Sequence, residues 1–122
     1  MKRILLILTA LLAVSAMQAQ KISHIETTAS WHFIYDENGK RLRTIGASQG
    51  QVVAYSEAFY ILKNGPFYHT YDAKGKKLHT FHESNVGDVL NASGDTFTSR
   101  KGNWIITWDK NGRKISTRHA SN

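Results

Sequence analysis

Apolar and polar positions alternate in three segments of this 122-residue chain, and the three segments read nearly alike. They are Trp31–Leu42, Phe67–Leu78 and Trp104–Ile115. In each segment, aromatic or β-branched residues recur at alternate positions and lead into the turn Asp-x-x-Gly-Lys/Arg. Period-two alternation of such residues predicts a β-strand. Asp at the start of the turn and Gly near its end favour a hairpin connection. The pattern therefore predicts three copies of one hairpin.

The turn aspartates Asp36, Asp72 and Asp109 are 36 and then 37 residues apart, a period typical of repeat architectures. The two later copies carry two further predicted strands upstream of the hairpin, and the first copy keeps only one of them. These upstream segments are Ser23–Thr28, Gln51–Tyr55, Phe59–Gly65, Asp88–Ala92 and Thr96–Gly102. No helical periodicity follows residue 20. The missing first strand would fall inside the N-terminal segment, and a partner could supply it.

The predicted fold is all-β, an antiparallel meander of about eleven short strands in three blade-like repeats. Four antiparallel strands in about 36 residues match the size of a propeller blade. A curled sheet or a barrel-like or sandwich-like unit within one chain is the preferred arrangement. The alternative is half of a dimeric, propeller-like ring, because exposed strand edges favour pairing with a second copy.

The alternating strands give each hairpin an aromatic stripe on one face. The three stripes are Trp31/Phe33/Tyr35, Phe67/His69/Tyr71 and Trp104/Ile106/Trp108. Because burial of such rings stabilises a fold, we expect the stripes to form the core. The alternative is a platform on which carbohydrate rings stack.

The N-terminus has the order of residues typical of a secretory signal peptide. Lys2 and Arg3 precede the apolar run Ile4–Val14, and small residues follow it. This run is shorter than the about 20 residues of a membrane-spanning helix. We expect cleavage after Ala19, with Ala16 as the second possible site and an uncleaved anchor as the alternative. The protein would then be periplasmic or secreted.

Removal of residues 1–19 would leave 20–122 as one domain, with repeats at about 21–49, 50–86 and 87–122. The chain has no Cys, which excludes a lipoprotein anchor and disulfides. Its net charge of +7 falls by the two cations of the signal segment to +5. A basic chain favours anionic partners. Here the positive residues are scattered and several lie in turns, so we interpret them as solvated charges of the turns.

The aromatic-Asp-x-x-Gly-Lys hairpins, with upstream Lys-Asn-Gly or Arg-Lys-Gly turns, resemble the tandem β-hairpin repeats of exported bacterial proteins. The resemblance covers nearly all of residues 21–122, although the Trp-Gly dipeptide of one such family is missing. It implies a repeat fold and an exported location. Much of this family is functionally uncharacterised, so it implies no catalytic residue.

The sequence predicts no catalytic set, no cofactor and no metal. No Gly-x-Ser-x-Gly elbow and no Gly-rich phosphate loop occurs. The turn aspartates are interpreted as caps rather than calcium ligands, because one turn supplies too few oxygens. His69 and His79, on neighbouring hairpin strands, are the pair from which a zinc site could be built, but no Cys supports one.

We therefore expect an exported, non-catalytic binding or protein-interaction module of the bacterial envelope. Its partner would be a glycan or an envelope protein rather than nucleic acid, and a homodimer could form through exposed strand edges. The candidate binding residues are those taken to break the core alternation, namely His32, Tyr55, Tyr60, Tyr68 and His79. The alternative is a small hydrolase acting on glycans, since the second repeat departs most from the others. A structural protein that polymerises edge to edge is a third possibility.

Overall fold

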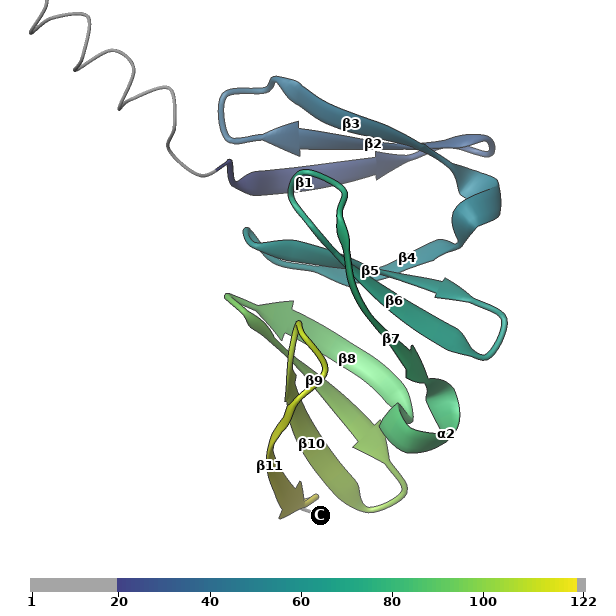
Figure 1. Cartoon of the computed structure of the whole chain (residues 1–122), viewed down its shortest axis with the longest axis vertical. Coiled ribbons are helices and arrows are strands. Elements are labelled where there is room, and N and C mark those ends of the chain that lie inside the picture. The colour runs from purple at the N-terminus through teal and green to yellow at the C-terminus, as the bar shows by residue number, and fades with distance from the viewer. Residues whose placement is uncertain (1–19, 121–122) are drawn as a thin grey trace, which may run out of the picture.

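The computed structural model describes residues 20–120, which form three antiparallel β-sheets stacked along the long axis (Figure 1). In each sheet, every strand pairs with the next strand of the chain. The first sheet contains β1 (Ile22–Thr27), β2 (Trp31–Asp36) and β3 (Arg41–Gly46). The second contains β4 (Gln51–Tyr55), β5 (Phe59–Asn64), β6 (Phe67–Asp72) and β7 (Lys77–His82). The third contains β8 (Asp88–Ser93), β9 (Thr96–Lys101), β10 (Trp104–Asp109) and β11 (Lys114–His119).

The predicted fold class is confirmed. The eleven strands fall into groups of three, four and four, and the curled sheets do not close into a barrel. The predicted signal peptide, residues 1–19, lies outside the described residues. Within residues 20–120, no helix has the length and apolar character needed to cross a membrane.

Two short helices link the sheets, and the sequence pattern did not predict either of them. The 3₁₀-helix η1 (Ala47–Gln49) leads into the second sheet, and α2 (Glu83–Val86) leads into the third. Segments of three or four residues are too short to show a helical period, so sequence periodicity does not reveal them. Both end at a glycine with positive φ, Gly50 or Gly87, from which the next sheet begins.

The repeated turns have one geometry, in which the aspartate caps the backbone. The Oδ1 atom of Asp36 accepts hydrogen bonds from the N–H groups of Asn38, at 2.9 Å, and Lys40, at 2.8 Å. The other two turn aspartates accept the same pair of bonds, from positions two and four residues on. The prediction of capping is confirmed, since the acceptor oxygens bind the turn itself.

The second sheet is buried on both faces, and its strand β5 lies at the centre of the molecule. Four consecutive residues, Phe59 to Leu62, are at most 1% exposed. Phe59 and Ile61 belong to the cluster shared with the third sheet, whereas Tyr60 and Leu62 belong to the cluster shared with the first. Successive side chains of a strand point to opposite faces, so β5 contributes to both cores.

The prediction that the aromatic stripes form the core is confirmed for Ile106 and Trp108 of the third sheet, but it is wrong for Trp104 at the start of that stripe and for Trp31 in the first sheet. Ile106 and Trp108 are 4% and 8% exposed, and pack against residues of the second sheet. Tyr71 packs partly buried against the first sheet. The stripes of the second and third sheets thus face the preceding sheet. No described sheet precedes the first one, and its Trp31 is 49% exposed.

The Asp109 turn predicts a pH-dependent stability. Hydrogen bonds from the backbone of Arg113 and Asn111 hold the pKa of the Asp109 carboxyl below its ordinary value. The resulting stabilisation is present above the unfolded pKa of about 3.9 and is lost as the pH falls through the lower folded pKa. We expect the difference in unfolding free energy between wild type and Asp109→Ala to shrink over that window. Urea unfolding at several pH values measures it, with Asp88→Ala, outside the turns, as control. A pH-independent difference would contradict this assignment.

The double burial of β5 predicts a large cost for truncating Phe59. Phe59→Ala removes a fully buried ring and should lower the free energy of unfolding by about 3–5 kcal/mol. The matched control is Phe67→Ala, because Phe67 is 42% exposed and should cost under about 1 kcal/mol. Urea denaturation measures both, and equal losses would show that β5 is not the centre of the core.

Candidate functional site

Two of the five candidate binding residues connect neighbouring sheets instead of facing solvent. The Nε2 atom of His32 is 2.7 Å from the carbonyl oxygen of Gly50. The Tyr68 hydroxyl donates to the carbonyl oxygen of Gly87 at 2.9 Å. His32 and Tyr68 occupy the same position of successive repeats and are each 3% exposed. The prediction that they lie on the surface was therefore wrong, because each one binds the glycine that starts the next repeat.

Tyr60 is a third candidate that the structure buries. It is 1% exposed and stacks on Tyr71, with 5.1 Å between ring centroids. Burial raises the pKa of the Tyr60 hydroxyl. Its placement on the surface was wrong because β5 is covered on both faces. Tyr55 is 37% exposed, and His79 is exposed, so ligand binding at these two residues stays a prediction.

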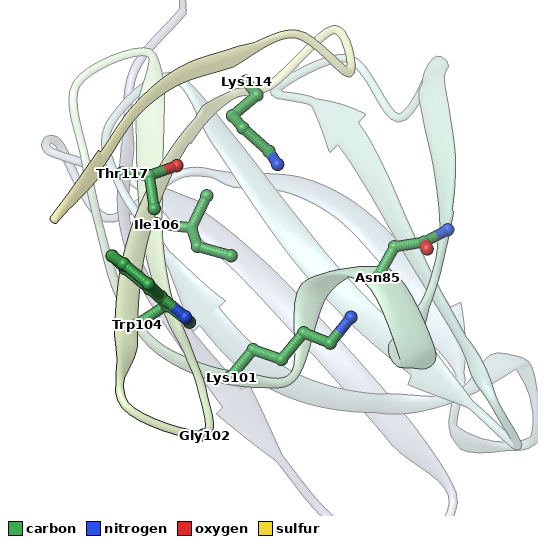
Figure 2. Close-up of a pocket in the computed structure, with 7 residues that line it drawn as sticks. All are labelled: Asn85, Lys101, Gly102, Trp104, Ile106, Lys114 and Thr117. Carbon is green, nitrogen blue, oxygen red and sulfur yellow. The ribbon is translucent and has the colours of Figure 1, made fainter. Parts of the chain in front are cut away.

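One hollow lies between α2 and strands β9 to β11 of the third sheet. Its volume is about 670 Å³. Figure 2 shows the residues that line it, which are Asn85, Lys101, Gly102, Trp104, Ile106, Lys114 and Thr117. They come from α2, from β9 to β11 and from the β9–β10 turn. Along β10, Ile106 and Trp108 are buried against the second sheet, whereas Trp104 is 50% exposed. The hollow lies beside this exposed ring.

A second hollow, of about 360 Å³, continues the first along the junction between the second and third sheets. The two share Asn85, Lys101 and Lys114 in their linings. The second hollow adds His79, Thr80, Phe81, His82, Trp108 and Gly112. We call the two hollows together the junction groove. Its lining contains no carboxylate.

The junction groove combines an exposed aromatic ring with positive charge. The Trp104 indole packs edge-on against the ring of His119, at 5.2 Å between centroids. Figure 2 shows Lys101 and Lys114 reaching toward the hollow from opposite sides, with Asn85 across from Trp104. Lys114 Nζ lies 5.4 Å from the ring centroid of Trp108. Among the described residues, neither lysine makes an ion pair. Their charge is therefore available to an anionic ligand.

The histidines do not assemble into the metal site that His69 and His79 could have formed. The register pairs His69 with Thr80, and His79 with Thr70, so the two imidazoles lie on opposite faces. The His69 ring bonds Thr80 Oγ1 at 2.9 Å, and burial, with the charge of Lys77, lowers the pKa of His69. Within residues 20–120, no three His or carboxylate side chains converge on one point that could hold a metal.

Sequence reasoning missed the junction groove, although one signal was present. Trp31, Phe67 and Trp104 each begin a stripe, and each is between 42% and 50% exposed. In the second and third sheets, the first position of the stripe is thus left partly uncovered by the preceding sheet. Trp104 is directly preceded by Asn103, whereas Trp31 follows Ser30 and Phe67 follows Pro66.

No protein-family model matches this chain, and comparison with curated proteins gives no significant match. Its resemblance to tandem hairpin repeats therefore stays a prediction.

The hydrogen bond between Tyr68 and Gly87 predicts a measurable loss of stability. Tyr68→Phe keeps the ring but leaves the carbonyl oxygen without this donor, which should cost about 1 kcal/mol. Tyr55→Phe is the control, because Tyr55 is partly exposed and should change stability little. Urea denaturation of both variants provides the measurement. An unchanged stability of Tyr68→Phe would mean that this bond does not hold the sheets together.

Proposed function

We propose that this protein is an exported, non-catalytic binding module of the bacterial envelope, and that the junction groove holds its ligand. The ligand class that fits best is a glycan carrying carboxylate or phosphate groups. The observation that carries the proposal is the half-exposed Trp104 beside two lysines, Lys101 and Lys114, in a hollow without carboxylates.

The aromatic ring favours a sugar over a small inorganic ion. A sugar ring presents one face of C–H groups, which can stack on the indole of Trp104 while its hydroxyls remain at the rim. Asn85 and Thr117 supply the side-chain amide and hydroxyl groups that can bind such hydroxyls. Binding sites commonly combine an apolar surface with a few placed polar groups in this way.

The two lysines favour an anionic sugar over a neutral one. They lie on different strands, so their ammonium groups can approach one acidic group from two sides (Figure 2). Exposed charge pairs contribute up to about 1 kcal/mol each, so these lysines would act more on selectivity than on total affinity. The groove offers one exposed indole and two lysines, whereas single-stranded nucleic acid needs a longer basic track with several aromatic platforms.

Binding of an acidic oligosaccharide tests the proposal. The full chain is expressed for export, and its melting temperature is measured with oligogalacturonate and with the same oligosaccharide as methyl esters. The acidic form should raise the melting temperature saturably, because a ligand of the folded state stabilises it. Trp104→Ala should abolish the rise, and Lys101→Gln with Lys114→Gln should weaken binding about tenfold.

The control is Lys74→Gln with Lys76→Gln, which removes two charges from a turn outside the groove lining. This variant should keep the response. Three results would contradict the proposal: equal responses to the acid and its ester, an effect of the turn variant as large as that of the groove variant, or release of new reducing ends. The last result would favour the hydrolase.

A further inference from the structure

We propose that the protein assembles head to tail, with the outer face of the first sheet docked on the outer face of the third sheet of a second copy. The N-face is the outer face of β1–β3 and carries Trp31, Phe33 and Tyr35. The C-face is the outer face of β8–β11 and carries Leu90, Ile105 and Ile115. Ile34 and Ile106 pack inward on these sheets, so their neighbours Phe33 and Ile105 point outward.

In the second and third sheets, the side that corresponds to the N-face packs against the preceding sheet. In the third sheet, Ile106 and Trp108 meet the second sheet, and in the second sheet Tyr71 meets the first. Phe33 and Tyr35 occupy the equivalent positions of the first repeat. They face no described sheet, and the adjoining Trp31 is half exposed.

The C-face shows the complementary pattern. Leu42 and Leu78 occupy one repeat position and pack against the sheet that follows theirs, whereas the third member of the series, Ile115, is 52% exposed. Val53 packs against the cluster shared with the third sheet, and its equivalent Leu90 is 53% exposed. The two end faces are thus the two halves of a junction that the chain already forms twice.

The Asp-x-x-Gly turns give independent evidence that the N-face lacks a covering sheet. A Cβ atom added to Gly75 would collide with Arg43 of the preceding repeat, and one added to Gly112 would collide with His79. Arg43 also donates from Nη1 to the carbonyl oxygen of Lys74 in that turn, at 2.8 Å. The equivalent glycine of the first repeat, Gly39, has no atom within 4 Å of such a Cβ. A preceding sheet would fill this space.

The guanidinium of Arg41 lies over the N-face, but it does not prevent a second copy from packing there. Arg41 lies 4.6 Å from the ring centroid of Phe33 and 6.0 Å from that of Tyr35. Lys77 and Lys114 occupy the same repeat position and lie in the same way over Tyr71 and Trp108, at 6.0 Å and 5.4 Å. Those two rings are at internal junctions that are already packed. A cation over the stripe is therefore compatible with a covering sheet.

The partner that covers the N-face is a second copy of the chain. Its C-face corresponds to the surface that covers the equivalent side at each internal junction. Such a contact joins two different surfaces, so copies joined by it form a closed ring or an open chain. Any assembly larger than a monomer then needs both an intact N-face and an intact C-face, one from each copy.

Light scattering coupled to gel filtration tests the junction. The full chain, expressed for export, should show a mass of at least two copies that falls on dilution. Trp31→Asp should block the N-face and Ile115→Asp the C-face, so that each variant alone is monomeric. An equimolar mixture should give dimers, because one variant still supplies the C-face and the other the N-face. This recovery also proves that both variants are folded.

The matched control is Tyr55→Asp, which places the same charge at an exposed aromatic residue of the second sheet and should leave assembly unchanged. Trp104→Ala should also leave it unchanged, since the groove lies on neither end face. A monomer at every concentration would overturn the proposal. Assembly that survives Ile115→Asp but not Trp31→Asp would also overturn it, since it would show an N-face to N-face contact. A mixture that stays monomeric would do the same.

Discussion

The burial of the second sheet on both faces is the constraint on which the rest of the structure depends. Strand β5 contributes Phe59 and Ile61 to one core cluster, and Tyr60 and Leu62 to the other. Each end sheet buries one face against the second sheet, and Val86 of α2 adds to the cluster at the third sheet. The chain has no cysteine and so no disulfide, and packing against this sheet holds the three repeats in one unit.

One repeated pattern acquires three different roles because each copy has different neighbours. The aromatic stripe is core in the third sheet, where the second sheet covers Trp108. It is an open face in the first sheet, where no described sheet precedes Trp31. At Trp104, which is half exposed, it lines the junction groove. Both the proposed ligand site and the proposed assembly follow from this difference in neighbours.

The sequence was sufficient for the features that local chemistry determines. The Asp-x-x-Gly turns and the period-two strands are read within a few residues, and the predicted number and grouping of strands were confirmed. It was insufficient where a contact partner lies in another repeat. His32 and Tyr68 look like polar interruptions of an apolar strand, yet they bind Gly50 and Gly87 of the next repeat. The junction groove likewise combines residues of α2, β9, β10 and β11, and alternation along one strand does not reveal how these elements meet.

Native-state hydrogen exchange tests most directly whether the second sheet holds the molecule together. Amides of β5 and β6 should exchange only through global unfolding, with the same free energy as denaturant unfolding of the whole protein. Amides of β11 should exchange with a lower free energy, because its side chains are exposed along the whole strand. The contradictory result would be protection that persists in the third sheet under conditions where β5 has already exchanged, since that sheet would then be stable by itself.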